Sequence, residues 1–153
     1  MDDEAKLLLR RLLTGSRLVC LAVLAESRPI AGLLPFVPAE DRGALLVQAS
    51  RLAKHSRGLF PGAPWSGLIH AADAKEADPL QVPRLTLEGT VEPVPPDEVG
   101  SARAAYLGRF PTAEVIAGLG DFTFHRLRIE GGRLVEGFGR AFNLSTASLR
   151  ELA

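Results

Sequence analysis

Several features that commonly reveal a function are missing from this sequence. Cys20 is its only cysteine, which excludes an intrachain disulfide framework and cysteine-rich zinc sites. Because Cys20 lies inside the apolar run of residues 18–24, we expect an inert, buried thiol. Lysine plus arginine and aspartate plus glutamate each number 18. This balance leaves no overall field that would attract nucleic acid or an anionic membrane.

Long apolar runs are also missing. No run approaches the ~18 residues that a membrane-spanning helix needs. The N-terminal residues Met1–Glu4 are acidic where a secretory signal is basic. We therefore expect a cytoplasmic protein with neither a membrane nor a nucleic acid as partner. The 153 residues fit one domain over residues 1–153, long enough to bury a core.

Recognisable catalytic and metal motifs are absent. His55, His70 and His125 are far apart in the sequence and do not have the spacing of zinc ligands. There is no GxSxG elbow, no identifiable pair of catalytic carboxylates and no glycine-rich phosphate loop of the common kinds. The sequence therefore predicts no metal site, and it leaves the catalytic residues unknown.

Strand patterns make up most of what is present. Alternation of apolar and polar residues, bounded by turn residues, predicts six or seven mostly antiparallel strands. They cover residues 17–25, 30–37, 44–49, 65–71, 84–94, 122–129 and 133–137. Gly131-Gly132 is predicted as the turn of the last hairpin. Helices are expected after a cap at Asp2 or Asp3, from 97 to 106, from 112 to 119 and from about 145. The fold class is mainly β (α+β).

A basic junction follows the third predicted strand. The segment Ser50–Arg57 gathers two hydroxyls, two arginines, a lysine and a histidine where that strand gives way to a short helix. Ser50 is predicted to cap the helix, whose free N–H groups would then face an anion beside the cationic side chains. Arg84 is a second candidate cation for the same site. The alternative is that Arg51, Lys54 and Arg57 form only a solvated helix face.

The ordered motifs of the chain resemble those of the FMN-binding split-barrel (pyridoxamine 5′-phosphate oxidase-like) family, and in particular its branch related to haem-utilisation proteins. The resemblance covers nearly the whole chain. It rests on the segments 50–55, 78–80, 83–89, 106–111, 121–122 and 137–141. It implies a six- to seven-stranded antiparallel split β-barrel with flanking helices, and a homodimer with two equivalent sites between the protomers.

The resemblance also implies which residues bind the cofactor. Ser50, Arg51 and His55 would hold the FMN phosphate together with the strand of Arg84, and Leu52 lies in the same motif. The flavin ring would be lined by the strand that carries Leu34, Pro35 and Phe36. The pocket would be closed by the partner's Phe138, Gly139 and Arg140. The implied function is that of a flavoprotein, an FMN-dependent oxidoreductase with an unknown small-molecule substrate.

Two alternatives use the same dimer cleft. One is a haem-binding or haem-utilisation protein, and the other is a cofactor-free dimer that keeps the fold. The chain departs from the flavin pattern at Gly58, where many relatives carry an asparagine that contacts the ligand. The haem-utilising relatives also carry a C-terminal domain with a haem-ligating loop, for which Ser145–Ala153 is too short.

Overall fold

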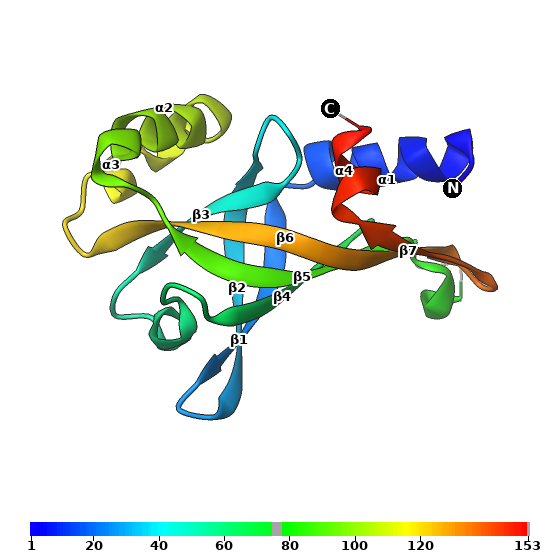
Figure 1. Cartoon of the computed structure of the whole chain (residues 1–153), viewed down its shortest axis with the longest axis horizontal. Helices are drawn as coiled ribbons and strands as arrows, with labels where there is room; N and C mark the ends of the chain where they lie inside the picture. The colour runs from blue at the N-terminus through cyan, green and yellow to red at the C-terminus, as the bar shows by residue number, and fades with distance from the viewer. Residues whose placement is uncertain (75–77, 153) are drawn as a thin grey trace.

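The computed structural model describes residues 1–74 and 78–152, which form a β-barrel with helices at its margins (Figure 1). The strands are β1 (Leu18–Ala25), β2 (Arg28–Pro38), β3 (Ala44–Ser50), β4 (Pro64–His70), β5 (Arg84–Pro93), β6 (Phe122–Gly137) and β7 (Arg140–Ser145). The α-helices are α1 (Asp3–Gly15), α2 (Val99–Arg109), α3 (Glu114–Ala117) and α4 (Thr146–Arg150). The 3₁₀ helices are η1 (Lys54–Gly58), η2 (Pro79–Gln81), η3 (Pro96–Glu98) and η4 (Pro111–Ala113).

Six strands close an antiparallel barrel in the order β3-β2-β1-β4-β5-β6. The barrel closes because β6 pairs with β3 as well as with β5. The first half of β6 pairs with β3, and its second half extends beyond the barrel to pair with β7. The prediction of a six- to seven-stranded antiparallel barrel with flanking helices is confirmed.

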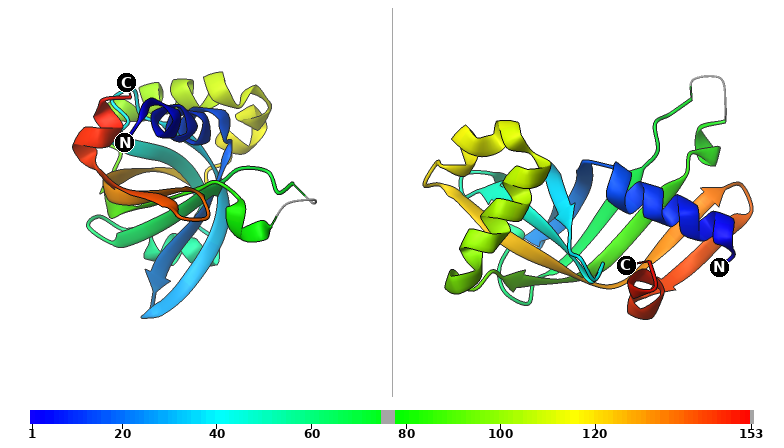
Figure 2. Two further views of the ribbon diagram at one scale, coloured as in Figure 1. Left: turned by 90° about the vertical axis from the view of Figure 1, so that its right-hand side faces the viewer. Right: turned by 90° about the horizontal axis from the view of Figure 1, so that it is seen from above.

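The core follows from the alternation that the sequence shows. In β1, Val19, Leu21 and Val23 point inward and are buried, whereas the residues between them are exposed. Helix α1 begins at its predicted cap, where the Asp2 carboxylate accepts a hydrogen bond from the Ala5 N–H at 3.0 Å. The apolar stripe of α1 is buried in the same core. Figure 2 shows α1 lying along the barrel, with its N-terminus beside the β6–β7 hairpin.

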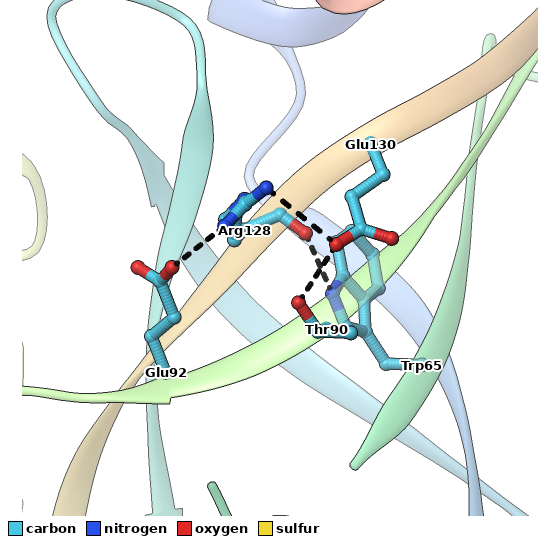
Figure 3. Close-up of polar contacts among 5 residues, drawn as sticks. All are labelled: Trp65, Thr90, Glu92, Arg128 and Glu130. Carbon is cyan, nitrogen blue, oxygen red and sulfur yellow. Dashed lines mark hydrogen bonds and ion pairs between the residues drawn. The ribbon is translucent and has the colours of Figure 1, made fainter. Parts of the chain in front are cut away.

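A close approach of two backbones fixes the β5–β6 pairing. A β-bulge lies between Glu88 and Gly89, and a Cβ on Gly89 would stand 1.9 Å from the Arg128 carbonyl oxygen. That carbonyl accepts a hydrogen bond from the Trp65 indole N–H at 3.1 Å (Figure 3). The Arg128 guanidinium lies between Glu92 at 3.5 Å and Glu130 at 3.8 Å. Glycine is therefore required at position 89 by space, because a side chain would occupy the place of the carbonyl.

The predicted turn at Gly131-Gly132 is wrong. Strand β6 runs unbroken through these glycines, and the chain turns at Phe138-Gly139 instead, where Gly139 has a φ of 83°. Gly132 serves a different purpose, because a Cβ there would lie 2.5 Å from the Thr86 carbonyl oxygen of β5. The pair Gly131-Gly132 therefore does not form a turn. Its second glycine allows β6 to approach β5 closely.

The expectation of a buried thiol at Cys20 is also wrong. Cys20 is exposed, because strand alternation places it on the outer side of the barrel between buried neighbours. Around it lie exposed leucines of β1, β2 and β4. We call this surface the outer leucine face, and it comprises Leu18, Cys20, Leu24, Leu33 and Leu68.

Membrane-spanning helices are not found in the described part of the chain: none of its helices has the length and apolar character needed to cross a bilayer. The longest of them, α1, has 13 residues.

Candidate functional site

The predicted site residues lie in three places. Ser50, Arg51, Leu52 and His55 lie at the junction between β3 and η1, which we call the β3–η1 junction. Arg84 lies with Phe138, Gly139 and Arg140 along one groove. Leu34, Pro35 and Phe36 belong to β2. Among residues 1–74 and 78–152, no hydrogen bond or ion pair joins the junction to the groove.

The side chains of the β3–η1 junction make their hydrogen bonds to the segment before β6. The Ser50 hydroxyl donates a hydrogen bond to the Asp121 carboxylate at 2.9 Å. The Arg51 guanidinium donates to the Gly120 carbonyl at 2.7 Å. A carboxylate thus lies where an anionic ligand was expected, and it would repel a phosphate. Leu52 is 86% exposed and covers nothing in the described chain.

The backbone of the junction is also different from the prediction. Ser50 does not cap a helix, because η1 begins only at Lys54 and has no side-chain cap. The Arg51 N–H donates to the Asp121 carbonyl, the Leu52 N–H to the Ser50 hydroxyl, and the Ala53 N–H to the Ser50 carbonyl. These N–H groups are therefore used within the chain, and they do not form an open anion-binding turn.

His55 lies against the barrel wall. A Cβ on Gly32 of β2 would come within 2.5 Å of the His55 Nδ1 atom, so the ring packs directly on that backbone. Burial lowers the pKa of His55. His125 of β6 lies near it, and its pKa is lowered first by burial and then by the charge of His55. Both rings therefore favour the neutral state.

Gly58 closes η1 against β1. A Cβ at this position would lie 2.7 Å from the Val23 side chain and 2.8 Å from the Leu24 carbonyl oxygen. Gly58, at the position where the split-barrel resemblance leads us to expect an asparagine, therefore lets η1 pack closely on the barrel.

The β2 residues contribute chiefly to the core. Leu34 and Phe36 point inward and are 3% and 0% exposed, whereas Pro35 between them is partly exposed. Only the backbone of this segment and the Pro35 ring could contact a ligand from outside the barrel.

Two neighbouring grooves lie beside the β6–β7 hairpin, one of about 490 Å³ on the α1 side and one of about 400 Å³ on the β5 side. We call the second the hairpin groove, and it is lined by Leu80, Arg84, Arg133, Val135, Gly137, Phe138, Gly139, Arg140 and Ala141. Leu80 and Phe138 are 64% and 84% exposed. The hairpin groove thus combines exposed apolar side chains with three arginines.

The arginines of the hairpin groove differ in how their charge is balanced. Arg140 forms ion pairs with Asp2 at 2.6 Å and with Glu136 at 2.5 Å, which raise the pKa of Arg140. The pKa of Asp2 is lowered first by its hydrogen bond from the Ala5 N–H and then by Arg140. Arg84 donates to the carbonyls of Leu80 and Val82, and Arg133 donates to the Asn143 side chain. In the described part of the chain, neither Arg84 nor Arg133 has an ion-pair partner. The groove is therefore suited to an anion that also has an apolar part.

Sequence reasoning missed two contributors to these places. Asp121 belongs to one of the motifs that carry the family resemblance, but no local pattern indicates that its carboxylate meets Ser50 across 71 positions. Arg133 lies opposite Thr86 of β5, a pairing between strands that the alternation within each strand does not reveal. Within the described ranges, no group of three or more His, Cys, Asp or Glu side chains is placed to hold a metal ion.

Comparisons with known proteins agree with this architecture. The family model described as "CREG, beta-barrel" matches residues 30–148. The chain is 34% identical over 127 residues to the heme oxygenase HutZ of Vibrio cholerae, covering 79% of this chain and 69% of that protein. It is 31% identical over 117 residues to the chloroplastic heme oxygenase HOZ of Arabidopsis thaliana, covering 76% of this chain.

A solved structure extends the likeness over the whole barrel. The heme binding protein of Mycobacterium smegmatis superposes with a TM-score of 0.83 at 29% identity, covering 99% of this chain. The chain spans 62% of that protein and 35% of the Arabidopsis protein.

Proposed function

The chain belongs to the CREG β-barrel family, and from this premise we propose that it binds haem as a member of the split-barrel branch that serves haem utilisation. The observation that carries the proposal is the hairpin groove, where exposed Leu80 and Phe138 lie beside Arg84 and Arg133. Haem has the same two parts, an apolar macrocycle and two carboxylates.

The groove residues fit such a ligand by their chemistry. The side chains of Leu80 and Phe138 would cover the macrocycle and exclude water from it. Arg84 and Arg133 would bind the propionates, since neither guanidinium is neutralised by a carboxylate in the described chain. Bound haem would supply an iron centre for redox chemistry, and the protein would supply binding, orientation and charge.

The flavin interpretation has weaker support from the geometry. Its phosphate site was expected at the β3–η1 junction, where the Ser50 hydroxyl is bonded to Asp121 and the backbone N–H groups are used. An FMN phosphate would have to displace the Asp121 carboxylate or lie beside it. FMN-dependent oxidoreductase activity is therefore the second candidate, favoured by the cations of the junction alone.

We also propose that the protein is a homodimer that associates through the outer leucine face. Leu33 is 65% exposed and Leu18 is 46% exposed, on the neighbouring strands β2 and β1, and Leu33 lies directly opposite the exposed Cys20. Such a surface is typical of a protein contact. In this dimer, the partner's Phe138, Gly139 and Arg140 would approach the β3–η1 junction, as the split-barrel resemblance implies.

Titration of the purified protein with haemin and, separately, with FMN tests the ligand. We expect a shifted Soret band with haemin at micromolar protein, and no quenching of FMN fluorescence. Replacing Arg84 by alanine should weaken haemin binding about tenfold to a hundredfold, since a charge-assisted hydrogen bond contributes about 1.5–3 kcal/mol. Arg150→Ala, on α4 away from the groove, is the matched control. An unchanged haemin spectrum, or FMN binding alone, would overturn the haem proposal.

Light scattering after size exclusion tests the dimer. Leu33→Glu places a charge on the outer leucine face and should give a monomer. Val115→Glu alters an apolar residue of α3 that is 79% exposed and lies outside both the outer leucine face and the β3–η1 junction, and it should leave the dimer intact. A monomeric wild-type protein, or a Leu33→Glu variant that stays dimeric, would contradict the proposed interface.

A further inference from the structure

His70, the last residue of β4, has an imidazole ring whose two nitrogens have different roles. Its Nδ1 atom lies 2.6 Å from the Ala71 carbonyl oxygen. A carbonyl oxygen can only accept a hydrogen bond, so Nδ1 must carry the proton. In the neutral ring, Nε2 is then left with a free lone pair, and the ring is exposed.

This arrangement is typical of histidines that bind metals. A ligating histidine usually donates its other ring N–H to a backbone carbonyl or a carboxylate, which fixes the tautomer and orients the ring. His70 has this support from the neighbouring residue, before any metal is bound. The Nε2 atom is the nitrogen that would reach an iron.

The surroundings of His70 match the two parts of haem. Arg84 lies directly opposite it on β5, and side chains of directly opposite residues share one face of the sheet. Leu68, two residues earlier on β4, lies on that same face, at the edge where it meets the outer leucine face proposed for the dimer contact, and it is 38% exposed in the single chain. Through Arg84 this face continues into the hairpin groove, because Arg84 lines that groove.

The other two histidines are poorly placed for the same role. The His55 ring packs on the Gly32 backbone, and His125 lies on β6 opposite Val47 of β3 and Pro93 of β5. Both His55 and His125 are only partly exposed. His70 therefore stands apart among the histidines as the exposed one.

We propose that His70 supplies an axial ligand to haem iron through Nε2, with Arg84 binding a propionate beside it. The inference rests on the proposed haem binding. In the step itself, the Nε2 lone pair forms a coordinate bond to ferric iron and a bound water leaves. No electron is transferred and the Nδ1 proton stays in place, hydrogen-bonded to the Ala71 carbonyl.

A first test needs no haem. Two-dimensional ¹⁵N–¹H NMR of the histidine rings in the free protein distinguishes the two neutral tautomers. We expect His70 to be the Nδ1–H tautomer at a pH where its ring is neutral, with the assignment made by its loss in His70→Gln. An Nε2–H tautomer at this position would overturn the proposed ligand, whatever haemin does.

The second test uses the haemin complex of the whole chain. His70→Gln should keep haemin bound but replace the histidine-ligated absorption and EPR spectra with those of a water-ligated ferric haem, and added imidazole should restore the former. His55→Gln and His125→Gln are the matched controls and should retain the wild-type spectra. A His70→Gln complex with the wild-type spectrum would overturn this inference and leave haem binding standing. Failure of the wild-type protein to bind haemin would overturn both.

Discussion

The Ser50 hydroxyl donates a hydrogen bond to the Asp121 carboxylate at 2.9 Å, and this single contact changes the meaning of the most informative sequence motif. From the sequence, the basic residues after β3 resemble a phosphate site. In the structure, the same segment connects β3 to the start of β6, because Arg51 bonds to both residues 120 and 121. The junction therefore has a structural role in closing the barrel, and any anion must compete with Asp121.

We predict that Asp121→Asn increases the affinity of the junction for inorganic phosphate and FMN. Removing one negative charge within a few ångströms of the site should strengthen anion binding about tenfold, a value reduced for solvent screening. Isothermal titration of wild-type and variant protein measures the change. Glu40→Gln removes an exposed charge on the β2–β3 connection and should have no effect. Equal affinities for Asp121→Asn and wild type would show that the carboxylate does not exclude anions.

We predict that Gly89→Ala is strongly destabilising. Its Cβ would lie 1.9 Å from the Arg128 carbonyl oxygen, so β5 and β6 must separate and the Trp65 hydrogen bond must lengthen. A loss of about 3 kcal/mol in the free energy of unfolding is expected, by analogy with overpacked cores. Urea denaturation followed by Trp65 fluorescence gives the value.

Gly100→Ala is the matched control for this substitution. A Cβ at Gly100 has nothing within 4 Å, and the residue lies in the first turn of α2. Alanine should stabilise that helix by up to about 1 kcal/mol. Similar effects of the two substitutions would contradict the spatial argument at Gly89.

Much of this fold could be predicted from the alternation of apolar and polar residues along the sequence. Alternation alone gives the strands, because a barrel wall buries every second residue, as Val19 and Leu21 show. It could not locate the last turn, since Gly132 and Gly139 look alike in sequence while only the second has a positive φ. The alternation of side chains in β1 also places Cys20 on the exposed side, although the apolar run around it predicted a buried thiol.

The site was harder to predict than the fold for a physical reason. Arg84 and Arg140 were identified from motifs, and the groove that they line depends on the β5–β6–β7 register. The role of Asp121 depends on a contact between distant segments, which no local pattern encodes.

We predict that stability falls as the pH decreases through about 6.5, the ordinary histidine value. Burial lowers the pKa of His125, and of His55 beside it, in the folded state. The unfolded state therefore binds more protons between the folded and unfolded pKa values, so stability declines there and levels off at lower pH. His125→Gln should flatten this part of the curve of melting temperature against pH, measured without haem. Equal slopes for His125→Gln and the wild-type protein would contradict the assignment.

We predict that Gly58→Asn does not create a ligand contact but displaces η1. The new Cβ would lie 2.7 Å from the Val23 side chain, and the Leu24 carbonyl oxygen is 2.8 Å away, so the 3₁₀ helix must move off β1. Destabilisation of about 1–3 kcal/mol is expected. Gly120→Asn, where a Cβ meets nothing within 4 Å, is the control.

The last prediction concerns the ion pair that ties the β6–β7 hairpin to the start of α1. Arg140 binds the Asp2 carboxylate at 2.6 Å, and the pKa of Asp2 is lowered first by its hydrogen bond from Ala5 N–H and then by Arg140. A depressed carboxyl pKa stabilises the folded state above the unfolded value of 3.8, and this stabilisation is lost as the pH falls through the folded value. Asp2→Asn should therefore lower the melting temperature near pH 6, and the difference from wild type should shrink as the pH approaches 3. Because both side chains are exposed, about 0.5 M salt should reduce the part of the effect that Arg140→Ala also removes. A difference between Asp2→Asn and wild type that is constant from pH 6 to pH 3 would show that the charge of Asp2 does not contribute.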